Sequence, residues 1–228
     1  TFTVTVPGTA VAALADGTQT ATASVTNRFG VTGTDTETVL VDTTPPTAPP
    51  ADVATASDSG SNTNDNITKD TKPIISGSGA TPGDTITVVM PGTGEVLTAP
   101  VQSNGTWSVT PTQALANGTA DVRVTATDPA GNTSPVTLVP VTIDATPPAA
   151  PTVNTLVTGD SRPIITGTAT LASGETLQVT VNGATYNVTV TNGTWSLDTA
   201  TATPASGSGA LGSFTAGQTY SVTATVTD

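Results

Sequence analysis

The residues best suited to chemistry in this chain are aspartates that stand beside proline-rich joints. Asp42 precedes Thr-Thr-Pro-Pro, and Asp144 precedes Ala-Thr-Pro-Pro about 100 residues later. Ca²⁺ takes about six to eight oxygen ligands from carboxylates, amides and backbone carbonyls. Carboxylates that gather at a joint repel one another unless a cation lies between them. The pattern therefore predicts calcium sites at the joints.

At the second joint, the prediction groups three carboxylates. Asp128 stands in the loop before a final strand, Asp144 at the end of that strand, and Asp160 just before the next first strand. This grouping assumes that the loop before the last strand faces the loop that opens the next module.

At the first joint, the corresponding group is Asp42 and Asp70, with Asp65 as a helper and Asn27 as a neutral ligand. A second interpretation stays open for every one of these residues. Aspartate before Thr, Pro or Gly is common in turns because its side chain accepts hydrogen bonds from nearby amides. On that interpretation the joints bind no ion, and proline alone sets their geometry.

The recurrence of the proline-rich exit predicts an array of similar modules. Residues 1–44 are interpreted as the C-terminal part of a module, residues 45–144 as a complete one, and residues 145–228 as one without its last strand. Four prolines between residues 45 and 50 predict an extended, semi-rigid joint. The polar stretch Ala51–Asp65 is predicted to be a loop.

Alternating apolar and polar residues predict an all-β fold, and no segment shows sustained helical periodicity. The middle module has about seven such segments, which is the number expected of an immunoglobulin-like sandwich. The predicted strands are Phe2–Val6, Thr20–Thr26, Glu37–Val41, Lys72–Gly77, Thr85–Met90, Glu95–Val101, a strand carrying Trp107, Asn117–Thr127, Pro135–Ile143, Leu171–Val181, Thr185–Thr191 and Tyr220–Asp228.

Composition argues against several classes of protein. The chain has 17 acidic and 5 basic residues, a net charge of −12, which disfavours binding to nucleic acid or to anionic lipid. It has no cysteine and no histidine, so disulfides, zinc–thiolate sites and the commonest general base are missing. No apolar run is long enough to insert into a membrane, and no signal peptide is visible.

Two further interpretations of the sequence are a glycosidase and a sugar-binding surface. Asp84 with Glu95, or Asp121 with Asp128, would be a candidate glycosidase pair, but nothing in the sequence fixes their separation. The tryptophan of each Asn-Gly-Thr-Trp-Ser segment, Trp107 or Trp195, would be a candidate for sugar stacking, although packing in the core is the expected role. The chain is therefore predicted not to be an enzyme.

The ordered motifs K/R-P-I-I-x-G, P-G-D-T-I-T-V, N-G-T-W-S, V-T-A-T-D-x-A-G-N and V-D-x-T-P-P resemble bacterial Ig-like repeats of giant type I-secreted adhesins and biofilm-associated proteins. The resemblance implies tandem sandwich modules on the outside of a bacterium, acting as a spacer in adhesion or biofilm formation. It also implies Ca²⁺ at module junctions. The expected partners are neighbouring modules of the same chain, with host or cell-surface ligands bound through other regions.

The sequence departs from this pattern at two turns. The first module has Asn27 and Val31 where the middle module has Asp128 and Asn132. Where the middle module has the turn Pro-Gly-Asp84, the third module has Ser-Gly-Glu175. Alternatives stay open: a glycan- or protein-binding module, an accessory region of a secreted enzyme, and a surface-filament subunit that donates a strand to its neighbour.

Overall fold

The computed structural model describes the chain except residues 1–4, 6, 12–13, 61 and 208–212. The described residues form strands, loops and one helical turn, α1 (Gly8–Val11), so the all-β prediction is confirmed. They divide into two compact units, Thr1–Ala145 and Thr146–Asp228. The division into three modules stays a prediction. Most of the predicted strand Phe2–Val6 lies outside the described residues.

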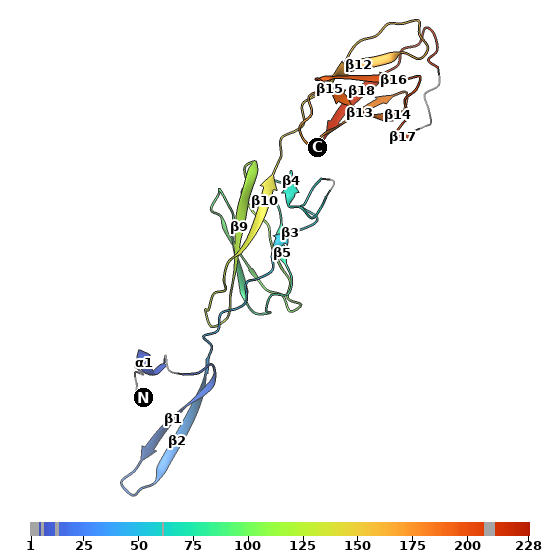
Figure 1. The fold of residues 1–228 in the computed structure, drawn as a ribbon. Coiled ribbons are helices and arrows are strands. Elements are labelled where there is room, and N and C mark those ends of the chain that lie inside the picture. The colour runs from blue at the N-terminus through green and yellow to red at the C-terminus, as the bar shows by residue number, and fades with distance from the viewer. Residues whose placement is uncertain (1–4, 6, 12–13, 61, 208–212) are drawn as a thin grey trace. The chain divides into compact units, whose positions relative to one another are not determined.

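The N-terminal hairpin consists of β1 (Gly17–Thr26) and β2 (Thr32–Val41), which pair antiparallel along their whole length (Figure 1). Asn27 closes the turn between them, because its side-chain oxygen accepts the amide of Val31 at 3.1 Å. Both strands are longer than the predicted Thr20–Thr26 and Glu37–Val41: β1 begins three residues earlier, at the end away from the turn, and β2 begins five residues earlier, next to the turn.

The segment from residue 45 to residue 145 is a sandwich of two sheets. One sheet has the strand order β4-β10-β9-β6-β7 and the other β3-β5-β8. All neighbours are antiparallel except β4, which runs parallel to the end of β10. The bounds are β3 (Asp52–Val53), β4 (Ile67–Thr68), β5 (Ile75–Gly77), β6 (Thr85–Val89), β7 (Val96–Pro100), β8 (Trp107–Val109), β9 (Gly118–Thr127) and β10 (Thr137–Ile143).

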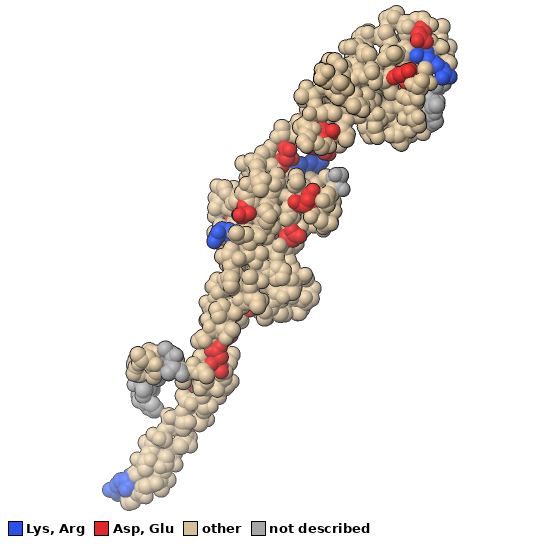
Figure 2. Space-filling model, viewed as in Figure 1, with Lys and Arg blue, Asp and Glu red and all other residues tan. Residues whose placement is uncertain are grey.

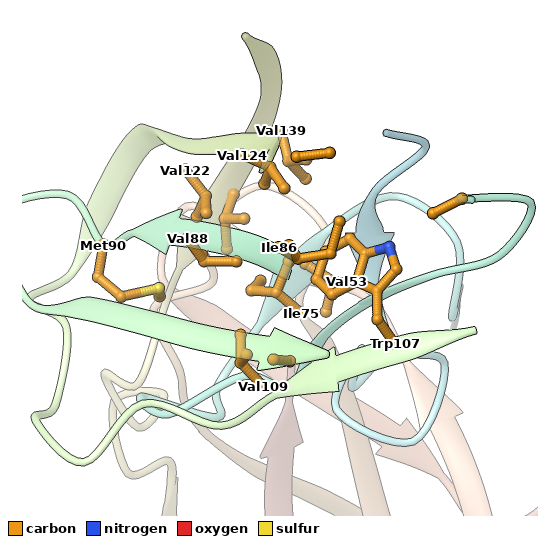
Figure 3. Close-up of a cluster of buried hydrophobic side chains, with 14 of the residues drawn as sticks. Val53, Ile75, Ile86, Val88, Met90, Trp107, Val109, Val122, Val124 and Val139 are labelled. Carbon is orange, nitrogen blue, oxygen red and sulfur yellow. The ribbon is translucent and has the colours of Figure 1, made fainter. Parts of the chain in front are cut away.

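The core of this sandwich lies between the two sheets, as Figure 3 shows. Every second residue of β6, and of β9 from Val122 onward, is buried, and Ile86, Val88, Val122 and Val124 are 0% exposed. Aliphatic side chains fill most of the space, and Trp107 closes it from β8. Burial of this apolar area is the main stabilising contribution to the fold.

The second unit is also a sandwich, with sheets of order β11-β12-β16-β15 and β17-β14-β13-β18. Its core contains Leu177, Val179, Tyr186, Trp195 and Leu197, and it is separate from the first core. The bounds are β11 (Thr152–Val153), β12 (Ile164–Thr168), β13 (Thr176–Val181), β14 (Ala184–Val188), β15 (Val190–Thr191), β16 (Thr194–Asp198), β17 (Ser206–Gly207) and β18 (Val222–Thr227).

The two tryptophans explain the glycine that ends each Pro-Ile-Ile-x-Gly segment. A Cβ atom added to Gly77 would lie 2.0 Å from the carbonyl oxygen of Pro50 and 2.7 Å from Nε1 of Trp107. At Gly167 the carbonyl oxygen of Thr152 and the Trp195 ring occupy the same space. Only glycine lets the neighbouring backbone carbonyl and the indole ring come this close to the strand.

The prediction that both tryptophans pack inside is confirmed, since Trp107 is 3% and Trp195 is 2% exposed. They offer no open ring face to a sugar, so the stacking alternative is wrong for these two side chains. The described residues of the predicted loop Ala51–Asp65 form a loop, as predicted, apart from the two-residue strand β3. No helix in the part of the chain that the structure describes could cross a membrane.

Candidate functional site

The loops of the first sandwich gather at two poles. The N-terminal pole consists of residues 42–50, 82–84 and 128–136. Its parts are joined by hydrogen bonds, because Nδ2 of Asn132 donates to the carbonyl of Asp42 at 3.0 Å and the Thr137 hydroxyl donates to the carbonyl of Pro49 at 2.7 Å. The linker is thus fixed to the sandwich that follows it.

Asp84 is the unusual residue of this pole. It follows a turn in which Gly83 has a φ of 98° and the Asp84 amide donates to the carbonyl of Thr81 at 3.2 Å. The side chain of Asp84 is 3% exposed, and no hydrogen bond from any described residue reaches its carboxylate. Burial raises the pKa of Asp84, and the negative charges of Asp128 and Asp42 raise it further.

The other carboxylates of the pole have donors. The carboxylate of Asp128 accepts two hydrogen bonds from Asn132, one from the side-chain Nδ2 and one from the backbone amide, both at 2.9 Å. These bonds hold the pKa of Asp128 below its usual value. One oxygen of Asp42 accepts the amide of Thr44 at 3.1 Å. The charges that act on Asp84 are both negative, so no basic group balances the buried carboxylate.

The C-terminal pole is built around the exit of β10. The amide of Asp144 donates to the carbonyl of Thr68 at 2.9 Å, and the amide of Asp70 donates to the hydroxyl of the same threonine at 3.0 Å. Asp70 also accepts the amide of Lys72 at 2.9 Å, while Asp65 accepts the amide of Ile67 at 3.1 Å. These contacts bring Asp144 and Asp70 to the same threonine.

The predicted grouping of the aspartates is therefore wrong in two places. Asp128 lies with Asp42 and Asp84, not with Asp144, because Asp128 and Asp144 stand before and after the seven-residue strand β10. Asp70 lies with Asp144 and not with Asp42. The physical reason is that a loop between antiparallel strands lies at the opposite end from the chain's exit.

Asn27 does not assist Asp42 either. The two residues stand at opposite ends of the hairpin, because β2 separates the Asn27 turn from Asp42. In the second unit, Asp160 accepts the amide of Arg162 at 2.9 Å, the same local contact that Asp70 makes with Lys72. Turn capping is thus a role shared by Asp65, Asp70 and Asp160.

Over the described ranges, no three histidine, cysteine or acidic side chains already stand in the arrangement of a metal site. From the sequence, Asp84 was considered only as half of a glycosidase pair. The Pro-Gly-Asp turn is the sequence signal that marks Asp84 as a candidate site residue. That pair is not formed, because Asp84 and Glu95 stand at opposite ends of β6. Asp84 directly precedes the strand, and Glu95 lies in the loop that follows it. Glu95 caps Thr112 and Gln113, and its bonds with Thr112 lower its pKa.

The second candidate pair is separated as well. Asp121 lies exposed within β9, and Asp128 follows the end of that strand, so their side chains are several residues apart along extended backbone. Figure 2 shows the acidic side chains of the visible face dispersed, without a single concentrated patch.

Residues 45–145 match a family profile described as the bacterial Ig-like domain. Among solved structures, 17 chains match. One belongs to a 1.5-MDa bacterial ice-binding adhesin studied for host cell surface retention, at 29% identity, covering 86% of this chain and 67% of that one, with a TM-score of 0.37.

Another is a Ca²⁺-stabilized adhesin that helps an Antarctic bacterium reach out and bind ice, at 26% identity, covering 92% and 56% of the two chains, with a TM-score of 0.37. A tetra-tandem repeat from the extending region of a large adhesion protein matches at 24% identity, covering 82% and 49%, with a TM-score of 0.36. The chain spans about half to two thirds of these proteins' solved lengths. No curated protein matches.

Proposed function

We propose, because residues 45–145 match the bacterial Ig-like domain profile, that the chain is a structural and adhesive repeat region of a bacterial surface or secreted adhesin. Its sandwiches act as spacers in cell adhesion or biofilm formation. Two features support this role: separate cores in the two units, and a linker hydrogen-bonded to the sandwich that it precedes.

Ca²⁺ is proposed to stiffen the joint at the N-terminal pole. The observation that carries this proposal is Asp84, a residue that is 3% exposed and whose carboxylate receives no hydrogen bond from the described residues. Asp42 and Asp128 supply further carboxylate oxygens and act on Asp84 electrostatically. This donor set is entirely oxygen and net negative, which suits a hard divalent cation.

The three ligands come from different parts of the pole. Asp42 belongs to the linker, Asp84 to the turn before β6, and Asp128 to the loop before β10. A cation bound by all three would join the linker to two loops and restrict its rotation. If the cation binds only the conformation in which the linker is fixed, it shifts the population of molecules toward that conformation.

At the C-terminal pole, Ca²⁺ binding by Asp144, Asp70 and Asp65, and by Asp160 in the second unit, stays a prediction. Three of these residues already accept local amides, so turn capping competes directly with ion binding there. The N-terminal pole is the stronger proposal because Asp84 has no such amide.

Calorimetry of the whole chain in EDTA and in millimolar Ca²⁺ tests the proposal. We expect Ca²⁺ to stabilise the first sandwich by about 3 kcal/mol when its concentration is about 100 times Kd. Asp84→Asn should abolish this gain, while the matched variant Asp121→Asn, which changes an exposed acid on β9, should keep it. No gain in the wild type, or an equal gain in Asp84→Asn, would contradict the calcium site.

A further inference from the structure

The exit of the N-terminal hairpin is held by Asp16, the residue directly before β1. The register of the hairpin pairs Gly17 with Val41, so Asp16 stands beside the first residues after β2. Its Oδ1 accepts the amide of Thr43 at 3.0 Å and the hydroxyl of Thr43 at 2.6 Å, and its Oδ2 accepts the hydroxyl of Thr44 at 2.5 Å. Both oxygens of one carboxylate thus bind the linker.

These bonds are not those of a local turn. Asp16 lies 27 residues from Thr43 and 28 residues from Thr44 in the sequence, and both threonines follow the end of the hairpin. Hydrogen bonds to an ionised carboxylate are about twice as strong as bonds between neutral groups. The bonds from Thr43 and Thr44 hold the pKa of Asp16 below its usual value, so they favour the charged carboxylate.

The first sandwich holds the same linker through a neighbouring residue. Nδ2 of Asn132 donates to the carbonyl of Asp42 at 3.0 Å. Asp42, Thr43 and Thr44 are consecutive, so one residue is bound to the sandwich and the next two are bound to the hairpin. No residue of the linker separates the two attachments, and Pro45 and Pro46 restrict the backbone that follows.

The equivalent residue of the first sandwich makes the same kind of contact with a different side chain. Asp16 and Asn117 both follow Ala-Leu-Ala and precede the glycine that begins a ten-residue strand, β1 or β9. Oδ1 of Asn117 accepts the amide of Ala145 at 3.2 Å, as Oδ1 of Asp16 accepts the amide of Thr43. Ala145 has no hydroxyl to donate, and an amide side chain has one acceptor oxygen where a carboxylate has two. The carboxylate thus occurs where threonine follows the exit, and the amide occurs where alanine does.

We infer that Asp16 is a positioning residue of the first joint: it fixes the orientation of the hairpin relative to the first sandwich, and it does so without an ion. The inference is independent of the proposed calcium site, because every bond that Asp16 accepts here comes from the chain's own donors. Attachments to consecutive residues remove rotation that an unattached linker would keep. The hairpin and the first sandwich therefore reorient as one body.

Residual dipolar couplings of the whole chain in EDTA test this inference. In the wild type, the amides of β1 and β2 and those of β6 and β9 should fit one common alignment tensor. In Asp16→Ala the two groups should need separate tensors, although each group stays consistent within itself, and hydrogen exchange of the Thr43 amide should increase by about tenfold. The matched variant Asp35→Ala removes an exposed acid from β2 and should change neither result.

The outcomes separate this inference from the proposed calcium site. A common tensor in Asp16→Ala, or separate tensors in Asp35→Ala, would overturn the role of Asp16. Separate tensors for the wild type in EDTA would overturn it as well; if Ca²⁺ then produced a common tensor, the calcium proposal would stand alone. A common tensor in EDTA together with no stabilisation by Ca²⁺ would contradict only the calcium site.

Discussion

Among single residues, Asp84 is an acid that the fold buries without a hydrogen-bond donor for its carboxylate among the described residues. Asp16, in contrast, accepts the hydroxyls of Thr43 and Thr44, and these bonds lower its pKa. The bonds of Asn132 do the same for Asp128. A buried group that lacks such partners destabilises the fold unless a ligand complements it, so it marks a candidate site.

The two tryptophans predict a measurable difference between the units. Nε1 of Trp195 donates to the carbonyl of Thr152 at 3.1 Å, whereas Nε1 of Trp107 is buried and has no partner. Trp195→Phe removes a hydrogen bond, and Trp107→Phe removes an unpaired donor. We therefore expect Trp195→Phe to cost about 1 kcal/mol more in unfolding free energy than Trp107→Phe.

Chemical denaturation of both variants, each compared with the wild-type transition of its own unit, measures this difference. The loss of ring area is the same in the two substitutions, so each serves as the control for the other. Equal losses in the two units would contradict the role given to the indole N–H of Trp195.

Among the structural elements, the linker of residues 42–50 depends on a side chain from another loop. Nδ2 of Asn132 joins the carbonyl of Asp42 to the carboxylate of Asp128. We expect Asn132→Ala to remove this link and to increase hydrogen exchange of the Thr43 and Thr44 amides by roughly fivefold or more, which corresponds to about 1 kcal/mol.

The matched control for this substitution is Asn27→Ala, since Asn27 closes the equivalent hairpin turn by local bonds only. Exchange in the core of β9 should stay unchanged in both variants. Unaltered exchange of the two linker amides in Asn132→Ala would show that the asparagine does not hold the linker.

The longer strands were predictable because alternation is visible over five or more residues, as in β6 and β9. Two-residue strands such as β3 and β4 carry no alternation, and their neighbours fix them. The site was predicted only in part. The sequence shows which acidic residues stand near the joints, but the burial of Asp84 and the pole to which Asp128 belongs depend on the closed sandwich.

At the scale of the whole molecule, the two cores share no residue, which predicts that each unit unfolds with its own sensitivity to mutation. Ile86 is 0% and Leu177 is 2% exposed. Ile86→Ala should destabilise only the first unit and Leu177→Ala only the second, each by about 2–5 kcal/mol.

Differential scanning calorimetry of the whole chain checks this prediction, because each variant should lower one transition and leave the other in place. Each variant is the control for the other. A common decrease of both transitions in either variant would show that the units unfold as one cooperative body.

The bonds from Asn132 to Asp42 and from Thr137 to Pro49 attach a linker to the sandwich that comes after it. Genes for repeated domains gain and lose copies by recombination. A crossover placed before Asp42-Thr-Thr-Pro-Pro transfers the linker together with its docking loops and preserves every one of these contacts. A crossover placed after Pro50 would join the linker to loops that lack these partners, so we expect exchange to conserve the contacts when it begins at Asp42 and not at the first strand.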